Sequence, residues 1–106
     1  MINVTSSEDF YKALDETNEA VVLFTAPSWC VPCQRFAPHF AAVAATTDDI
    51  TFVKVDIDEA DSELQAMVQS VPTVVYHRNG DGVAVDLRQR TAAALLGEIA
   101  NARTSG

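Results

Sequence analysis

Two cysteines, Cys30 and Cys33, are the residues best suited to chemistry in this sequence of 106 residues. Residues three apart share one face of a helix, so the two thiols can meet and form a disulfide. A helix that begins at Cys30 leaves backbone N–H groups unpaired and carries partial positive charge at that end, which stabilises a thiolate. Pro32 suits the first turn of such a helix, because the nitrogen there needs no hydrogen. The spacing therefore predicts a reversible redox centre.

Two other interpretations of the cysteine pair stay open. Zinc could bind both thiols together with His39 and His77. An ideal helix turns His39 about 240° away from Cys33, however, and His77 has no second ligand beside it in the sequence. Alternatively, the cysteines could be buried and unreactive, although Trp29 and Pro32 next to them argue against this. A purely structural disulfide is disfavoured, because a loop of about four residues contributes only about 2 kcal/mol.

The cysteines follow a predicted strand and begin a predicted helix. The run 20–25 is apolar, rich in β-branched residues and bounded by Pro27, which is typical of a strand buried on both faces of a sheet. A turn from Ser28 leads into a long helix, in which Pro38 removes one backbone donor and predicts a kink.

The remaining elements follow from alternation, helical spacing and turn residues. A short strand is expected at Ile2 and Val4, and further strands at 50–57, 73–76 and 83–85. Helices are expected from Ser6 to near Asn18, from Asp61 onward, and after the cap Thr91, with Leu95, Leu96 and Ile99 on one face. The Asn-Gly turn at 79–80 makes the last two strands an antiparallel hairpin. The order β-α-β-α-β-α-β-β-α predicts an α/β fold, a central mixed β-sheet flanked by helices on both faces. At this length, residues 1–106 are expected to form a single domain, and nothing in the sequence suggests more than a monomer.

Composition and charge exclude several classes of protein. Hydrophobic residues make up 48% of the chain, which is typical of a globular protein. Seven basic and fifteen acidic residues give a net charge of −8, so no nucleic-acid partner is expected. No apolar run approaches the roughly 18 residues of a membrane span, and the N-terminus lacks the pattern of a signal peptide. With only two cysteines the chain is not a disulfide-rich secreted scaffold, and a cytoplasmic location is expected.

The motifs together resemble the thioredoxin family over nearly the whole chain. The run Trp29-Cys30-Val31-Pro32-Cys33, with Pro38 five residues later, resembles the family's Trp-Cys-Gly-Pro-Cys active site and its helix proline. In the same order, Lys54 to Asp58 resembles the next central strand, Val71-Pro72-Thr73 the cis-proline loop, and Asn79-Gly80 the hairpin turn. The resemblance implies the thioredoxin fold.

The resemblance also implies a function and a set of roles. The chain would be a protein thiol–disulfide oxidoreductase in which Cys30 is the exposed nucleophile and Cys33 resolves the mixed disulfide. Pro72 would be cis, which would let the backbone of Val71 pair with an extended substrate. Trp29 would supply an apolar wall, although it could instead fill the core. No bound cofactor is needed, because the cysteine pair is the redox centre; the partners would be disulfide-containing proteins and a thioredoxin-reductase-like flavoenzyme.

Three departures from the family pattern bear on redox tuning and target choice. The family's buried Asp before the active site is replaced by Leu23, or by Phe24 if no residue is inserted. Lys54 then lacks its acidic partner; it could favour a thiolate or simply extend out of a strand. Val31 stands in place of glycine and, with Pro32, is expected to tune the potential. Arg88 falls near a family glycine beside the substrate groove, where it could favour acidic targets or be a solvated charge.

Two rival functions remain at this point. The chain could be a specialised or oxidising relative, since Val31 and the missing acid make strong reducing power less secure. It could also be a non-catalytic thioredoxin-fold subunit of a larger enzyme, in which the cysteines are dispensable.

Overall fold

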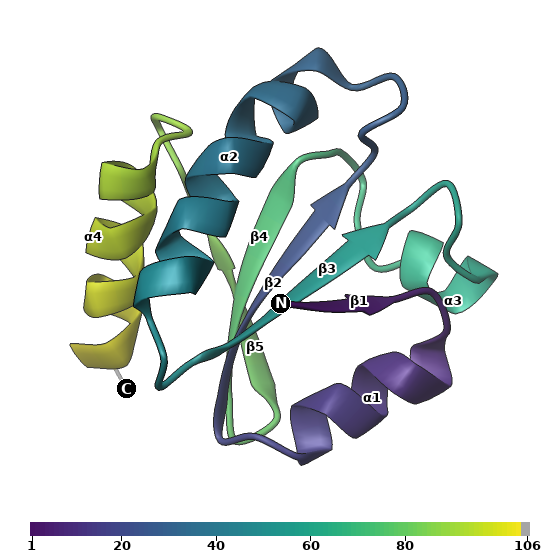
Figure 1. Ribbon diagram of the computed structural model, residues 1–106. Helices are drawn as coiled ribbons and strands as arrows, with labels where there is room; N and C mark the ends of the chain where they lie inside the picture. Colours follow the sequence, from purple (N-terminus) through teal and green to yellow (C-terminus); the bar gives the residue numbers. More distant parts are fainter. Residues whose placement is uncertain (105–106) are drawn as a thin grey trace.

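A five-stranded mixed sheet forms the centre of the computed structural model, which describes residues 1–104 (Figure 1). The strands lie in the order β1-β3-β2-β4-β5. Their bounds are β1 Ile2–Val4, β2 Glu19–Thr25, β3 Thr51–Asp56, β4 Thr73–Arg78 and β5 Asp81–Val85. The pairs β1–β3 and β2–β3 are parallel, and β2–β4 and β4–β5 are antiparallel. The mixed sheet and the final hairpin predicted from the sequence are confirmed.

Two helices cover each face of this sheet (Figure 1). Helices α2 (Val31–Thr46) and α4 (Ala92–Thr104) lie on one face, and α1 (Ser7–Asp15) and α3 (Ser62–Gln65) lie on the other. None of the helices in residues 1–104 is both long and apolar enough to cross a membrane.

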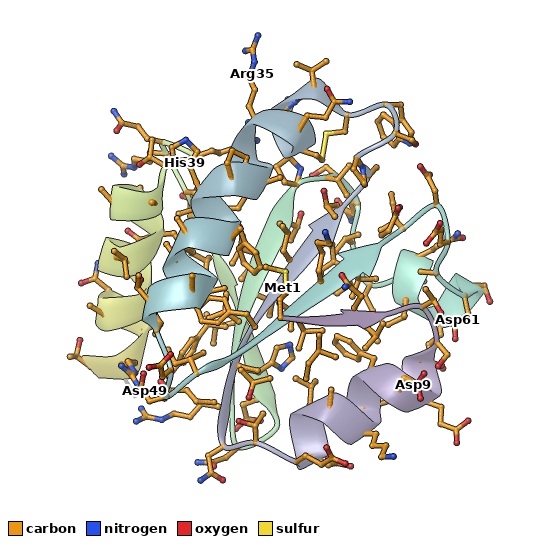
Figure 2. All side chains as sticks on the ribbon, in the orientation of Figure 1. Met1, Asp9, Arg35, His39, Asp49 and Asp61 are labelled. Carbon is orange, nitrogen blue, oxygen red and sulfur yellow. A yellow bond between two sulfur atoms is a disulfide. The ribbon has the colours of Figure 1, made fainter. Side chains whose placement is uncertain are left out.

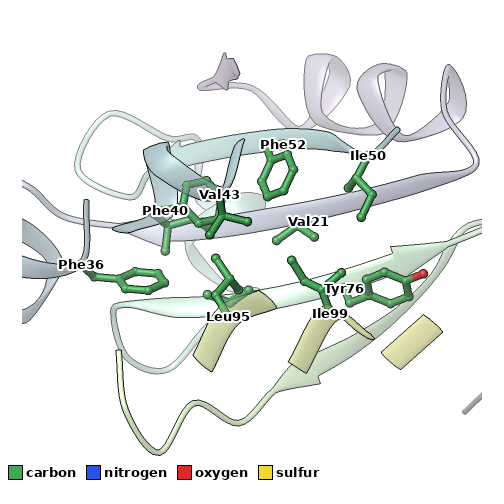
Figure 3. Close-up of a cluster of buried hydrophobic side chains, with 11 residues drawn as sticks. Val21, Phe36, Phe40, Val43, Ile50, Phe52, Tyr76, Leu95 and Ile99 are labelled. Carbon is green, nitrogen blue, oxygen red and sulfur yellow. The ribbon is translucent and has the colours of Figure 1, made fainter. Parts of the chain in front are cut away.

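The central strand β2 faces two separate cores. Val21 and Leu23 join the cluster under α2 and α4 (Figure 3), while Val22 and Phe24 join the cluster under α1. All four side chains are at most 2% exposed. Alternate residues of a strand point to opposite faces, so a strand covered on both sides must be apolar at every position. This explains the uninterrupted apolar run in the sequence.

One carboxylate, that of Asp61, holds the start of two helices on the α1–α3 face (Figure 2). It caps α3 by accepting from the N–H of Leu64 at 3.0 Å, and it accepts from the N–H of Ser7 in α1 at 2.6 Å. The hydrogen bond from Ser7, followed by that from Leu64, holds the pKa of Asp61 below its ordinary value. The cap therefore fixes α1 and α3 relative to each other.

At the opposite end of the molecule, Arg103 ties the end of α4 to the sheet. Its guanidinium forms hydrogen bonds with Glu19 at the start of β2 and with Asp49, which is labelled in Figure 2. The hydroxyl of Tyr76 donates to the same Glu19 carboxylate. Arg103 is the main reason that the pKa of Glu19 lies below its ordinary value.

Two details differ from the sequence-based expectation. Helix α1 ends at Asp15, not near Asn18, because the hydroxyl of Thr17 hydrogen-bonds the backbone of Glu19 and offers the chain an alternative to another helical turn. In α4, Leu95 is buried but Leu96 is 46% exposed, since consecutive helical residues point about 100° apart.

Candidate active site

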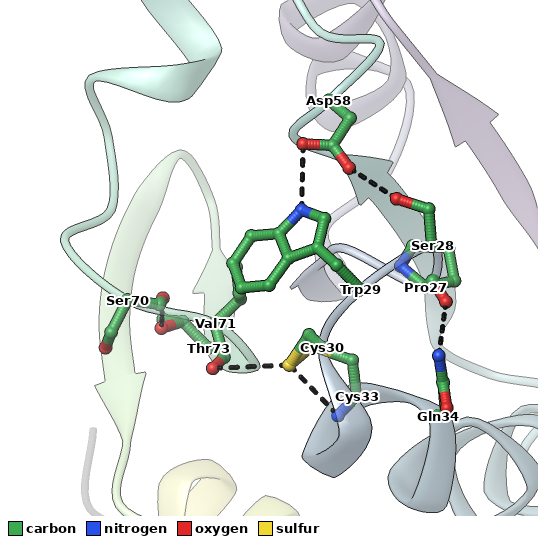
Figure 4. Close-up of a disulfide and its surroundings, with 10 residues drawn as sticks. All are labelled: Pro27, Ser28, Trp29, Cys30, Cys33, Gln34, Asp58, Ser70, Val71 and Thr73. Carbon is green, nitrogen blue, oxygen red and sulfur yellow. Dashed lines mark hydrogen bonds between the residues drawn. A yellow bond between two sulfur atoms is a disulfide. The ribbon is translucent and has the colours of Figure 1, made fainter.

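The two cysteines are joined by a disulfide at the start of α2 (Figure 4). Their Cα atoms lie 5.2 Å apart. The chain leaves β2 at Thr25 and turns tightly, with the N–H of Cys30 donating to the carbonyl of Ala26 at 2.9 Å. The amide of Gln34 donates to the carbonyl of Pro27 at 2.8 Å and ties the first turn of α2 back to this loop. The redox pair is thus held between a buried strand and a helix N-terminus, as the spacing predicts.

Cys30 itself caps helix α2. Its sulfur accepts a hydrogen bond from the backbone N–H of Cys33 at 3.2 Å (Figure 4). A thiolate at this position would receive the same N–H and the positive end of the helix dipole, both of which stabilise negative charge. Pro32 occupies the first turn of the helix, as expected.

The loop before β4 lies against the disulfide. The peptide bond between Val71 and Pro72 is cis, in agreement with the expectation. The carbonyl oxygen of Val71 lies 3.7 Å from the sulfur of Cys30, and the hydroxyl of Thr73 donates to the carbonyl of Ser70 at 2.6 Å (Figure 4). No hydrogen bond within residues 1–104 uses the backbone N–H of Val71. The carbonyl of Val71 therefore faces the redox pair, and its N–H has no partner within residues 1–104.

Trp29 stands out of the surface beside the disulfide. It is 60% exposed, so the interpretation of this side chain as core filling is wrong. Its indole N–H donates to Asp58 at 3.1 Å, and the hydroxyl of Ser28 donates to the same carboxylate at 2.8 Å (Figure 4). Sequence reasoning missed this anchor. The signal that could have found it is position, because Asp58 follows β3 and the carboxyl ends of parallel strands meet at one edge of a sheet.

The cysteines are less accessible than the resemblance implied. Cys30 is 5% exposed and Cys33 is 1% exposed in this oxidised form. The expectation that Cys30 is exposed is therefore wrong for this oxidised form, because its sulfur is bonded to Cys33 and packed against Val71. Val31 next to them is 51% exposed. Trp29 and Val31 thus form an exposed apolar rim around a recessed disulfide.

The register of the sheet decides which residue lies beside Lys54. In the parallel pair β2–β3, Leu23 is opposite Lys54 and Phe24 is opposite Val55. Leu23 faces the core under α2, whereas Phe24 faces the other core. Lys54 is partly buried and forms no salt bridge or side-chain hydrogen bond within residues 1–104. An apolar side chain therefore occupies the place next to this lysine.

The histidines do not complete a zinc site with the cysteines. His39 accepts from the N–H of Ala92 at 3.0 Å and so helps to hold the start of α4. His77 lies on β4 with its ring against Phe10. No group of three possible metal ligands occurs in the part of the chain that the structure describes. The observed disulfide uses both thiols instead.

Comparison with known proteins gives a consistent result. A family model described as thioredoxin matches residues 1–101. The thioredoxin of Geodia cydonium is 35% identical over 103 residues, which cover 93% of this chain and 96% of that relative. The structure of Plasmodium falciparum thioredoxin has a TM-score of 0.80 at 33% identity and covers 95% of this chain and 98% of its own. The oxidised form of mitochondrial thioredoxin 3 from Saccharomyces cerevisiae has a TM-score of 0.79 at 26% identity, with 95% and 94% covered.

Proposed function

The chain belongs to the thioredoxin family, and we propose that it reduces protein disulfides with Cys30 as the attacking thiol and Cys33 as the resolving thiol. It is a thiol–disulfide oxidoreductase of the thioredoxin type, with the Cys30–Cys33 disulfide as its redox centre. The observation that supports these roles is the sulfur of Cys30 at the N-cap of α2, where it accepts from the N–H of Cys33 at 3.2 Å. Only the first cysteine of the pair holds that position.

The first step is attack on a target disulfide. The thiolate of Cys30 forms a bond to one target sulfur, the target S–S bond breaks, and the other target sulfur leaves as a thiolate that takes a proton from water. The helix N-terminus stabilises the attacking thiolate before the step. The apolar rim of Trp29 and Val31 contacts the target around the reacting sulfur. The N–H and C=O of Val71 pair with the backbone of the target beside Pro72.

The second step regenerates the observed disulfide. Cys33 loses its proton and attacks the sulfur of Cys30, which releases the second target sulfur as a thiolate. Two electrons pass from the dithiol of the protein to the target. Because Cys33 is one helical turn beyond Cys30, the attack needs no rearrangement of α2.

Membership of the family implies disulfide-bearing target proteins and a reductase system that recycles the dithiol. We further propose a monomer of one domain over residues 1–106, a cytoplasmic location and a thioredoxin-reductase-like flavoenzyme as the electron donor. Val31, Pro32 and Lys54 are the residues expected to tune the potential.

The test is reduction of insulin disulfides, first with dithiothreitol and then with NADPH and a thioredoxin reductase. Full activity is expected from the natural chain and none from Cys30→Ser. Cys33→Ser should form a mixed disulfide with the target that is not released. Equal activity of both variants and the natural chain would leave the cysteines dispensable and favour a binding subunit. A reduction potential well above the glutathione poise of roughly −220 to −320 mV would favour an oxidising role.

A further inference from the structure

A hollow next to the cis-proline loop contains a cationic side chain that the sequence did not single out. It has a volume of about 150 Å³ and lies between α2, β4, β5 and the segment that joins β5 to α4. Pro72 and Thr73 form one side, and Asp86 and Arg90 lie on another. Pockets for small molecules usually exceed roughly 300 Å³, so this hollow is the size of one side chain.

The guanidinium of Arg90 forms no salt bridge with any residue from 1 to 104. The salt bridges of residues 1–104 all involve Arg103 at the opposite end of the molecule, and Arg90 has no internal hydrogen bond or ion pair. Asp86 lines the same hollow but does not come within salt-bridge distance of Arg90. In a chain of net charge −8, an unpaired cation at this place is available to a negative group of a partner.

Arg88, which the resemblance places near the substrate groove, lines an adjoining hollow. This second hollow shares Asp86 and Leu87 with the first and extends along α4 past Ala94 and Glu98. Arg88 does not line the hollow that contains Pro72. Arg88 and Arg90 are two residues apart and both are exposed, so Arg88 offers a matched control of the same charge.

We propose that Arg90 selects targets that carry a glutamate two residues from the reacting cysteine; this inference rests on the proposed function. A target cysteine that reaches Cys30 lies opposite Val71, because the Val71 carbonyl is 3.7 Å from that sulfur. Alternate residues of an extended chain point to the same side, so the side chain two positions away is the one that reaches past Pro72 to the hollow.

The lining of the hollow matches this side chain. Arg90 lines the hollow together with the half-buried Val85 and with Phe36 and Val74, which are at most 3% exposed. Glutamate has an apolar stem and a terminal carboxylate, so its stem can lie against Val85 while the carboxylate meets the guanidinium. Asp86 lines the same hollow and repels a carboxylate there. Removing the charge of Asp86 should therefore strengthen the preference for glutamate.

The test uses symmetrical peptide disulfides with Glu or Gln two residues before or two residues after the cysteine. The rate constant for oxidation of the reduced protein is measured with each peptide. The ratio of the rate constants for the Glu and Gln peptides is then compared between variants, because differences in the general repulsion by the acidic chain largely cancel in this comparison. In Arg90→Gln the ratio should fall about threefold for one of the two placements, a size typical of an exposed ion pair. It should stay unchanged in Arg88→Gln, rise in Asp86→Asn, and fall toward the Arg90→Gln value when salt is added to the natural protein.

Each outcome decides between the two proposals. The role of Arg90 is overturned if the Glu/Gln rate ratio is the same in the natural protein and in Arg90→Gln at both placements. It is also overturned if Arg88→Gln lowers this ratio as much as Arg90→Gln does. In either case, normal reduction of insulin leaves the proposed function intact. Rates no higher than those of Cys30→Ser on every disulfide would reject the proposed function, and the role of Arg90 with it. Urea unfolding of each variant checks that the exposed substitutions leave the fold unchanged.

Discussion

Restoring an acid at Leu23 should speed the resolving step and weaken the fold. Leu23 is 1% exposed, points to the core under α2 and lies opposite Lys54 in the sheet. The thiol of Cys33, which we propose as the resolving group, is itself only 1% exposed, and it must lose a proton before it can attack. Burial disfavours the charged form of a thiol. A carboxylate at position 23 would accept that proton, directly or through a water molecule.

The cost in stability follows from the burial of Leu23. Replacing it with Asp forfeits the burial of a leucine side chain, about 1.5–3 kcal/mol, and buries a carboxyl group at about 1–3 kcal/mol. The free energy of unfolding should therefore fall by about 3–5 kcal/mol, with Lys54 nearby offsetting the upper part of that range. Domains of this size have about 5–15 kcal/mol in total, so the variant should be assayed at low temperature, with its unfolding curve measured in urea.

The gain in rate should be about tenfold at pH 7. Evolved general bases contribute roughly 100- to 10,000-fold, and a carboxylate introduced without further adjustment is expected to reach less than this. The assay mixes the reduced protein rapidly with excess peptide disulfide and follows the fluorescence of Trp29, the only tryptophan, as the internal disulfide closes. At high peptide concentration the first attack is fast and the resolving step limits the rate.

Leu23→Asn is the matched control. Asparagine has nearly the same shape as aspartate and also buries a polar group at position 23, but it cannot accept the proton of Cys33. Both variants should lose stability, and only Leu23→Asp should gain rate. If Leu23→Asp resolves no faster than Leu23→Asn, the proton-acceptor argument is refuted, whatever the effect on stability.

Three further predictions concern side chains around the site and the core. Asp58→Ala should lower the fluorescence anisotropy of Trp29 by releasing its indole N–H, while Asp58→Asn, which keeps an acceptor oxygen, should lower it less. Burial lowers the pKa of His77, so the free energy of unfolding should fall as the pH drops below about 6.5, by at most about 1.4 kcal/mol per pH unit from this group. In His77→Phe, the free energy of unfolding measured in urea should therefore change less between pH 7 and pH 5. Arg103→Gln should lower the free energy of unfolding by about 1 kcal/mol at pH 7. The loss should be smaller at pH 3, because Arg103 holds the pKa of Glu19 low and protonation of Glu19 ends this stabilisation. In urea titrations, Arg103→Lys should retain only part of the stability that Arg103 provides.

The sequence predicts the fold well where the side chains of a segment are needed only for burial. Strand β2 is apolar at every position from Ala20 to Phe24 because both of its faces are covered there, and few other structures explain such a run. The end of α1 was harder to predict, since Thr17 competes for the backbone through its own hydroxyl. That competition depends on the exact turn into β2, which residue types alone do not specify.

The residues around the disulfide also differ in how well the sequence predicts their positions. Cys30, Cys33 and Pro32 lie together in the sequence, and helix geometry alone places them. Asp58 and Arg90 come from distant segments, and their positions depend on strand order and on the path of the segment after β5. Their types, one acid among fifteen and one base among seven, give no signal of their own, and a role of Arg88 in target choice stays a prediction.

Strand pairing explains why these distant segments meet. In the parallel pair β2–β3, Thr25 lies opposite Asp56, so the segments that leave both strands, with Trp29 on one and Asp58 on the other, emerge at the same edge. In the antiparallel pair β2–β4, Phe24 lies opposite Thr73, so the chain entering β4, with its cis Val71–Pro72 bond, starts at that edge too. A shift of β4 by two residues would preserve every buried side chain's face yet move Val71 roughly 6–7 Å along the strand. The register of this one pair therefore brings the cis-proline loop to the disulfide.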